Sequence, residues 1–220
     1  MSGGLFDPPE NLSLFPEGTI PGARDPFFYE RRVRAAGFER VCGVDEAGRG
    51  PLAGPVVAAA VILPERVDLA GIRDSKQMTA RRREDAFPRI LRQAAAAGIG
   101  VVSQRYIDEF NILRAALEAM KRAVLGLDPP PDFLLVDGIH KVPLPLSQRC
   151  IKKGDRLSRS ISAASVLAKV YRDRIMRACH EMYPEYGFDR NKGYGTAAHL
   201  SALARYGPCP FHRFTFKRVR

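Results

Sequence analysis

The feature that most constrains the fold is an unbroken apolar run from Pro55 to Leu63, made largely of β-branched and small residues. A run of this kind, without polar alternation, is typical of a strand that is buried on both faces. It is far too short to cross a bilayer, which takes about 20 apolar residues. We therefore expect an internal strand of a sheet and no membrane partner.

Strands and helices alternate along the chain, which favours an α/β layer architecture. Apolar runs predict strands, and helical periodicity predicts the segments between them. The expected strands are at residues 40–44, 55–63, 98–105, 133–138 and 147–151, and the expected helices at 26–36, 79–97, 107–125, 158–182 and 196–206.

Cysteine usage and the N-terminus favour a cytoplasmic protein. The four cysteines are widely separated, and Cys42 and Cys150 lie within expected strands, where a thiol is usually a small buried hydrophobe. The N-terminus lacks the basic stretch and apolar core of a secretory signal. Both observations fit a reducing compartment.

The net charge of +11 is concentrated in the last 80 residues, which hold 17 Lys and Arg against 5 Asp and Glu. Aromatic residues are interleaved with these cations, and aromatic faces beside cations suit a nucleic acid whose sugars or bases can be stacked upon. A basic surface that serves only solubility remains the alternative. The aromatic residues are Tyr183, Tyr186, Phe188, Tyr194, Phe211 and Phe214.

Three of the expected strands end in acidic residues, at Asp45-Glu46, at Asp137 and, after a short turn, at Asp155. Carboxyl ends of neighbouring strands converge on one crevice, where ionised carboxylates repel each other and need a counter-charge. Hard divalent cations such as Mg²⁺ and Mn²⁺ prefer oxygen ligands. No histidine or cysteine accompanies these acids, which disfavours zinc.

Two such ions, roughly 3.5–4 Å apart, can hold an attacking water and a leaving oxygen in phosphoryl displacement. The alternative is that each Asp merely forms a turn, since Asp is common at strand ends. Adjacent strand residues face opposite ways, so Asp45 and Glu46 share a site only if the strand breaks there. Gly48 and Gly50 make such a break reasonable.

The segment from Val44 to Pro55, VDEAGRGPLAGP, closely resembles the signature of ribonuclease HII, the type 2 ribonuclease H family. Further matches follow in order and with similar spacing, over about residues 38 to 216. They are Asp74-Ser75-Lys76, Asn111-Ile112-Leu113, Val136-Asp137-Gly138, Lys153-Gly154-Asp155, residues 161–170, Lys192 to Thr196 and His199.

The resemblance implies a ribonuclease H-like fold, with a central mixed five-stranded sheet flanked by helices and a small helical C-terminal part. Residues 1–25 are rich in Pro and Gly and show no periodicity, so we expect a flexible extension there. A catalytic domain at 26–182 and a basic helical appendage and tail at 183–220 would follow. The implied activity is endonucleolytic cleavage of RNA in RNA–DNA hybrids and at ribonucleotides embedded in duplex DNA, by a monomer. The implied catalytic and metal-binding residues are Asp45, Glu46, Asp137 and Asp155.

By the same resemblance, Gly48, Arg49 and Gly50 form a loop that contacts the backbone and 2′-hydroxyl at the ribonucleotide–deoxyribonucleotide junction, and Tyr194 stacks on the adjoining deoxyribose. Physical chemistry agrees, because glycines let main-chain amides approach a hydroxyl closely and the 2′-hydroxyl distinguishes RNA from DNA. A buried tyrosine is the alternative for Tyr194, but its flanking glycines favour an exposed ring.

Lys169, Ser75 and Lys76 are weaker candidates for contacts with the nucleic-acid backbone. Lys169 lies in a helix of small residues and could reach a phosphate, or it could simply pair with Asp173 at i+4. One departure from the family pattern is Asn191, where histidine is common, so the role of that position is in doubt.

Two other functions remain as alternatives. An exonuclease could use a similar set of four carboxylates, although the junction loop argues against it. A nucleic-acid-binding module with structural acids would bind in a salt-sensitive manner without cleaving.

Overall fold

The computed structural model describes residues 14, 25–69, 71–72 and 78–219. The expected flexible extension at residues 1–25 lies almost entirely outside this range. Ser75 and Lys76 also lie outside the described residues.

The centre of the molecule is a mixed five-stranded sheet, as predicted. Its strands are β1 (Val41–Ala47), β2 (Val56–Ile62), β3 (Ala96–Val102), β4 (Phe133–Asp137) and β5 (Ser147–Ile151). Their order is β3-β2-β1-β4-β5. β2 pairs antiparallel with β1 and β3, whereas β4 pairs parallel with β1 and β5.

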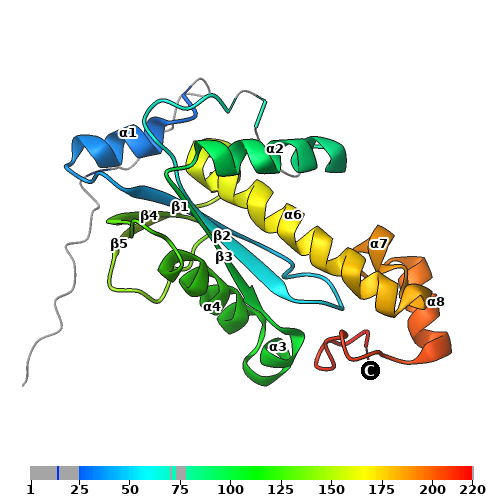
Figure 1. The fold of residues 1–220 in the computed structure, drawn as a ribbon. Helices are drawn as coiled ribbons and strands as arrows, with labels where there is room; N and C mark the ends of the chain where they lie inside the picture. Colours follow the sequence, from blue (N-terminus) through cyan, green and yellow to red (C-terminus); the bar gives the residue numbers. More distant parts are fainter. Residues whose placement is uncertain (1–13, 15–24, 70, 73–77, 220) are drawn as a thin grey trace, which may run out of the picture.

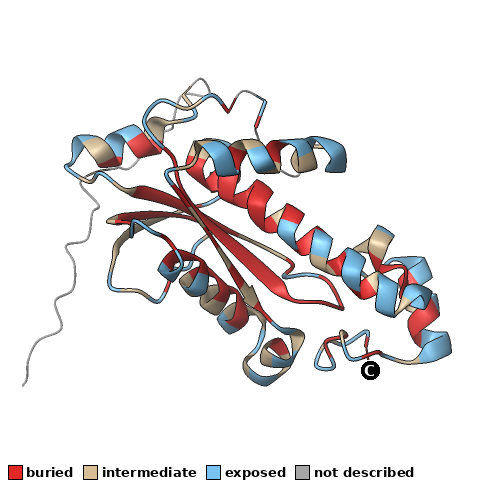
Figure 2. Ribbon diagram, viewed as in Figure 1, coloured by how far each residue is buried: buried red, intermediate tan, exposed pale blue. Residues whose placement is uncertain are grey.

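Helices cover both faces of this sheet (Figure 1). On one face lie α2 (Ala80–Gln93) and the long α6 (Arg159–Met182), and on the other α3 (Gln104–Phe110) and α4 (Ile112–Leu125). Every residue of β2 is buried, which confirms the prediction from its apolar run (Figure 2). The two apolar layers fix the sheet as a rigid platform for residues at its strand ends.

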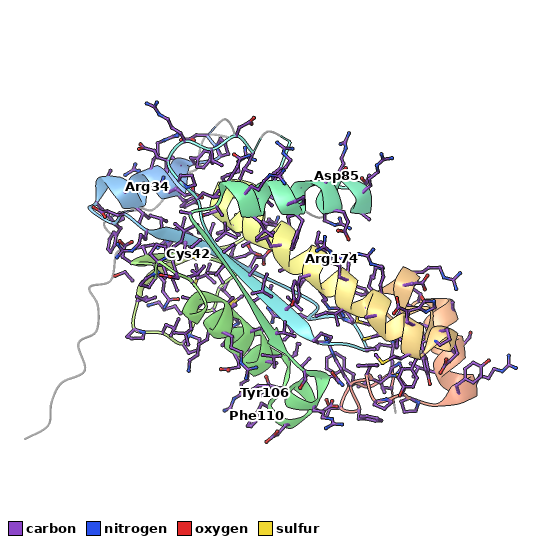
Figure 3. All side chains as sticks on the ribbon, in the orientation of Figure 1. Arg34, Cys42, Asp85, Tyr106, Phe110 and Arg174 are labelled. Atoms are coloured by element: carbon purple, nitrogen blue, oxygen red, sulfur yellow. The ribbon has the colours of Figure 1, made fainter. Side chains whose placement is uncertain are left out.

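The start of α6 lies very close to β1. A Cβ at Gly43 would lie 2.1 Å from the carbonyl carbon of Ser160, so only glycine allows this approach. Farther along α6, Arg174 reaches across to α2, where its Nη2 lies 2.7 Å from Glu84 Oε2 and its guanidinium lies over the Phe87 ring (Figure 3). These contacts hold the two helices of one face together.

A single helix over residues 107–125 was predicted, and this prediction is wrong. The chain breaks at Asn111, whose φ of 82° is not helical, and α4 begins afresh at Ile112. The side chain of Asn111 caps α4 by accepting hydrogen bonds from the amides of Leu113 and Arg114. The helical apolar stripe continues across the break, so periodicity alone does not reveal it. Tyr106 and Phe110 project together from α3 (Figure 3).

The boundary between α2 and β3 also differs from the expectation. The helix ends at Gln93 rather than at residue 97, and β3 already begins at Ala96, paired with Ile62 of β2. An alanine run has no strong strand tendency of its own, so the pairing with β2 decides its conformation.

The C-terminal part is helical, as expected, with a 3₁₀ turn (Pro184–Tyr186), α7 (Phe188–Asn191) and α8 (Ala197–Tyr206). These elements share an apolar cluster with the end of α6, including Met176 and Cys179. A domain boundary at residue 183 stays a prediction.

The expectation that the C-terminal aromatic residues are available for stacking is wrong for two of them. Tyr186 and Phe188 are buried in the C-terminal cluster, with ring centroids 5.4 Å apart. Tyr194 and Phe214, in contrast, are about half exposed. The small C-terminal part needs its own core, and aromatic residues supply much apolar area in little chain length.

A short helix, α1 (Phe28–Ala35), precedes the sheet and contributes one buried acid. Glu30 Oε1 accepts hydrogen bonds from Ser158 Oγ at 2.6 Å, the Ser160 amide at 2.8 Å and Ser160 Oγ at 2.7 Å. The carboxylate thereby satisfies donors at the N-terminus of α6, where negative charge is favourable.

All four cysteines are free thiols, and Cys42 is fully buried in β1 (Figure 3). The packing role expected for Cys42 is therefore confirmed, and Cys150 in β5, although partly exposed, packs against the same apolar cluster. Cys179 and Cys209 are buried in the C-terminal cluster. Among the described residues, no helix combines the length and apolarity that a membrane crossing requires.

Candidate active site

Three of the four predicted carboxylates, those of Asp45, Glu46 and Asp137, lie near one another at the end of β4. Val44 of β1 pairs with Val136 of β4, so Asp45 and Asp137 follow on neighbouring parallel strands. β4 ends at Asp137, but β1 continues to Ala47 because its antiparallel pairing with β2 extends to Val57. The predicted strand break at Asp45 and Glu46 is therefore wrong. Asp45 and Glu46 face opposite sides of β1, yet both lie near Asp137, because the neighbouring strand β4 ends at that residue.

Asp45 is 4% exposed and is held on the α6 side, where it accepts a hydrogen bond from the Ser165 hydroxyl. Burial, together with repulsion from Glu46 and Asp137, raises the pKa of Asp45 well above its usual value. Hydrogen bonds from Ser165 and from the Glu46 amide, at 2.7 Å, partly oppose this rise. Asp45 is thus an acid that needs nearby positive charge in order to ionise.

Glu46 lies on the opposite side of β1, facing α4. Burial raises the pKa of Glu46, repulsion from Asp137 adds to this, and Arg49 opposes it. Arg49 Nη1 lies 3.3 Å from Glu46 Oε1, and the arginine side chain is 47% exposed. Arg49 therefore partly neutralises Glu46 while remaining accessible from outside.

Asp137 and Asp155 are linked through Gly154. The Gly154 amide donates a 2.6 Å hydrogen bond to Asp137 Oδ1, and Asp155, 2% exposed, is the next residue. Gly154 and Asp155 belong to the short helix α5 (Gly154–Leu157), which begins three residues after the end of β5. The fold therefore brings the carboxylates of β1 and β4 into electrostatic contact. Asp155 is buried and follows the glycine that binds Asp137, and its place among the metal-binding acids stays a prediction.

The donor set suits hard divalent cations. It consists of carboxylate oxygens in a buried setting, where like charges raise the pKa and a cation would relieve the repulsion. Within the described ranges, no three His, Cys, Asp or Glu side chains form a ready-made cage for an ion. Several of the oxygens accept one hydrogen bond from a protein donor, which leaves further lone pairs of each carboxylate available to an ion.

A cavity of about 210 Å³ opens beside the acids. One wall is polar and includes Glu46, Arg49, Asp137 and His140, and the other is formed by apolar side chains of α4 with Ile139. The apolar wall limits the access of water to the carboxylates from that side. The apolar lining residues are Leu113, Ala116, Leu117, Met120 and Ile139.

The loop after β1 has the backbone geometry that its glycines predict. Gly48 has a φ of 101°, and a Cβ there would lie 2.1 Å from Arg172 Nε. A Cβ at Gly50 would lie 3.7 Å from Tyr194 Cε1, so the loop and the tyrosine ring lie side by side. Segments almost 150 residues apart in the chain thus form one surface next to the acids.

Tyr194 is 46% exposed, which confirms the expected exposed ring. Asn191 braces its loop: Asn191 Oδ1 accepts from the Gly193 amide at 2.7 Å, and Asn191 Nδ2 donates to the Tyr186 carbonyl at 2.6 Å. The amide of Tyr194 donates to the Asn191 carbonyl at 2.9 Å. Asn191 is therefore a structural residue of the tyrosine loop.

A second, basic cavity of about 120 Å³ lies on the other side of this loop. Its polar lining includes Arg83, Lys169, Arg172 and Ser165, with Tyr194 at the edge. Lys169 forms the expected ion pair with Asp173, but Asp173 is buried, not a surface residue. The two interpretations of Lys169 are thus compatible, because it both pairs with Asp173 and lines the cavity.

Two buried arginines were missed from the sequence. Arg172 and Arg213 are 1% and 0% exposed, and their described hydrogen bonds go to backbone carbonyls. Many of these carbonyls belong to residues 48–55, here called the glycine loop. Nothing in the charge pattern separates them from the exposed cations of the same region. Burying a charged side chain is costly unless it is hydrogen-bonded, so the burial of these two arginines marks them as structurally important. Burial is known only from the structure.

Known proteins resemble this chain over most of its length. The family model described as Ribonuclease HII matches residues 42–219. The chain is 55% identical over 209 residues to the ribonuclease HII of Syntrophotalea carbinolica, covering 95% of this chain and 98% of that one, and 53% identical to that of Geobacter sulfurreducens, covering 96% and 95%.

Among solved structures, the crystal structure of ribonuclease H2 from Pyrococcus horikoshii superposes with a TM-score of 0.72 at 28% identity. It covers 83% of this chain and 96% of the other. The fold expected from the sequence, a ribonuclease H-like sheet with flanking helices, is thereby confirmed. The chain belongs to the ribonuclease HII family and is an endoribonuclease that acts on RNA–DNA hybrids.

Proposed function

We propose that this protein hydrolyses phosphodiester bonds in the RNA strand of RNA–DNA hybrids and at single ribonucleotides within duplex DNA, with the help of two divalent ions. Asp45, Glu46, Asp137 and Asp155 would hold the ions, Mg²⁺ or Mn²⁺. The observation that supports this most strongly is the raised pKa of two buried carboxylates that face a third at a strand end. Such a site is unfavourable without bound cations.

When bound, such ions supply an activated water and stabilise the leaving oxygen. The residues of the chain prepare for this in separate ways. Ser165 orients the carboxylate of Asp45, the Gly154 amide orients that of Asp137, and the apolar wall of α4 restricts bulk water. Arg49 can exchange Glu46 for a phosphate oxygen, because guanidinium groups bind both anions through the same donors.

Recognition of the ribonucleotide is proposed to rest on the glycine loop and Tyr194. Gly48, Arg49 and Gly50 would present main-chain groups to the 2′-hydroxyl, and the Tyr194 ring would stack on the next deoxyribose. The 3.7 Å separation between Tyr194 Cε1 and a Cβ built at Gly50 supports this assignment, because both contacts must fall on adjacent nucleotides.

The basic cavity is proposed to accept a backbone phosphate. Lys169, Arg83 and Arg172 converge there beside the Ser165 hydroxyl, and a phosphate there would lie within reach of Tyr194. Charge neutralisation of this kind gives affinity without sequence preference. Ser75 and Lys76 are proposed as additional backbone contacts.

A covalently closed DNA duplex with one embedded ribonucleotide tests the function directly. With Mg²⁺ or Mn²⁺ we expect a single nick at the ribonucleotide, and with a chelator no nick. An exonuclease would leave the circle intact because it has no end to attack. A binding module would retain the duplex at low salt without nicking it. Either of these last results contradicts the proposal.

We further propose that the protein acts as a monomer in the cytoplasm. The described residues leave the glycine loop, Tyr194 and the acids in one chain, so no second copy is needed to complete the site.

A further inference from the structure

Two adjacent residues of the C-terminal segment, His212 and Arg213, are fully buried, and their side chains form hydrogen bonds with different partners. The segment is fixed against the glycine loop by main-chain pairing. The Gly54 amide donates to the Phe211 carbonyl at 2.8 Å, and the Arg213 amide donates to the Leu52 carbonyl at 2.9 Å. The side chains of 212 and 213 then extend in different directions from this anchor.

Arg213 holds the carbonyl oxygens of the glycine loop. Its Nη2 donates to Gly48 at 2.6 Å, and its Nη1 to Arg49 at 3.1 Å and to Pro51 at 2.8 Å. Both Nε and Nη2 donate to the Gly54 carbonyl. A rigid guanidinium fork is suited to several acceptors at once, which an ammonium group is not. Because Arg213 binds these carbonyl oxygens from the inside of the protein, the outer surface of the loop is left to its main-chain N–H groups.

His212 is linked to the tyrosine loop through His199. His199 Nδ1 lies 2.9 Å from the Tyr194 carbonyl oxygen, which can only accept, so the neutral His199 ring carries its proton on Nδ1. His199 Nε2 is then an acceptor, and His212 Nε2, 2.9 Å away, donates to it. His212 Nδ1 is therefore an acceptor, so of the two Cys209 backbone groups near it the amide at 3.0 Å donates to it and the carbonyl oxygen at 3.3 Å does not pair with it.

The direction of this chain is fully determined. It begins at a backbone donor, the Cys209 amide, and ends at a backbone acceptor, the carbonyl of Tyr194. Both rings are 0% exposed and are packed against the Tyr186 and Phe188 rings, so each link of the chain lies inside the C-terminal cluster. A change at His212 therefore reaches the backbone of Tyr194 through His199.

We propose that His212 and Arg213 are positioning residues that set the distance between the glycine loop and Tyr194, and so determine specificity for the ribonucleotide–deoxyribonucleotide junction. This rests on the proposed function of those two elements. A continuous hybrid offers a 2′-hydroxyl at every position of its RNA strand, but a single ribonucleotide must be matched at both contacts simultaneously. Cleavage of the junction should therefore depend more strongly on the separation of the two elements.

The test compares kcat/KM on a DNA duplex with one ribonucleotide and on a uniform RNA–DNA hybrid. Arg213→Lys keeps the charge but loses the fork, and His212→Asn keeps an acceptor for Cys209 but is too short to reach His199. We expect each to lower the junction-to-hybrid ratio by ~10-fold or more, since misplacement of about 1 Å can cost 100-fold. His212→Gln, whose amide nitrogen reaches the Nε2 position, should restore most of the ratio.

Two control variants separate positioning from general effects. Lys217→Met removes an exposed charge from the same segment, and Leu203→Ala weakens the C-terminal cluster through a side chain that takes no part in the hydrogen bonds of Arg213, His212 or His199. Neither should change the ratio. The proposal is overturned if the His212 and Arg213 variants lose activity equally on both substrates, or if Leu203→Ala lowers the ratio as much as they do.

A second measurement does not require activity. The chain contains no tryptophan, so Tyr194→Trp introduces a single fluorophore into the loop. In this background His212→Asn should raise iodide quenching of the tryptophan, whereas His212→Gln should not. Equal quenching in all three proteins would refute the link to His212. If the wild-type protein failed to cleave either substrate, the proposed function would fail, but quenching would still decide the positioning role.

Discussion

Asp45 is a residue that the fold tolerates at a cost. It is buried, and burial with repulsion from Glu46 and Asp137 raises its pKa, so its charged form destabilises the ion-free protein. Residues of this kind are typical of functional sites, where stability is given up for chemistry.

Asp45→Asn should separate these two effects. The amide keeps an acceptor for the Glu46 main chain but loses the charge that binds cations. We expect cleavage to fall by at least ~100-fold while the free energy of unfolding of the metal-free protein rises by about 1 kcal/mol. Nicking assays and urea denaturation in chelator measure the two. Wild-type turnover would remove Asp45 from the mechanism.

Tyr194 is expected to act through its ring. Tyr194→Phe keeps the stacking face and should retain junction cleavage, whereas Tyr194→Ala should lose about 1–3 kcal/mol of stacking, or roughly 5- to 150-fold in kcat/KM on the single-ribonucleotide duplex. Binding to plain DNA duplex, measured by anisotropy, should change much less. An equal loss on both substrates would argue against a stacking role.

At this scale the sequence indicates the acids and the glycine loop because a dense local motif contains them. It does not indicate Arg213 or His212, because their partners lie about 160 and 13 residues away and the roles depend on burial. A buried arginine and a surface arginine look identical in a basic tail.

The break between α3 and α4 gives a prediction at the level of elements. Asn111 combines a positive φ with a side-chain cap, so Asn111→Ala should lose both and destabilise the protein by about 2 kcal/mol. Asn111→Gly keeps the conformation and loses only the cap, so its destabilisation should be clearly smaller. Thermal or urea unfolding measures the difference. Equal losses would show that the backbone conformation contributes nothing.

Most elements follow from the sequence because their apolar pattern is local. The buried β2 and the long α6 lie where periodicity places them. The continuation of β1 past Glu46 does not follow, since it is imposed by pairing with β2. The separation of α3 from α4 was also missed, because one apolar stripe spans both helices.

At the scale of the whole molecule, the buried histidines make stability depend on pH. Burial, and then the proximity of His199, lowers the pKa of His212 to about 4, and burial lowers that of His199. Between the unfolded value of 6.5 and the folded value the unfolded chain binds more protons. Stability is therefore complete above pH 6.5 and is lost as pH falls, by up to ~1.4 kcal/mol per pH unit for each histidine.

Urea unfolding from pH 7.5 to 4.5 measures this slope. His212→Gln, which cannot be protonated, should show a shallower slope than the wild type over the same interval. The thiol of Cys209 and the phenol of Tyr186, which lie nearby, have raised pKa values and stay neutral throughout, so they do not contribute. Parallel slopes in the two proteins would contradict the assignment.

The contact of Glu30 with the start of α6 has a consequence for any shortened form of the protein. The region that matches the Ribonuclease HII family model, residues 42–219, begins after α1. Glu30 of α1 nevertheless binds Ser158 and Ser160, only a few residues beyond Asp155. A polypeptide trimmed to the shared region would keep every acid of the site. It would lack the anion that fastens the longest helix beside the last of them.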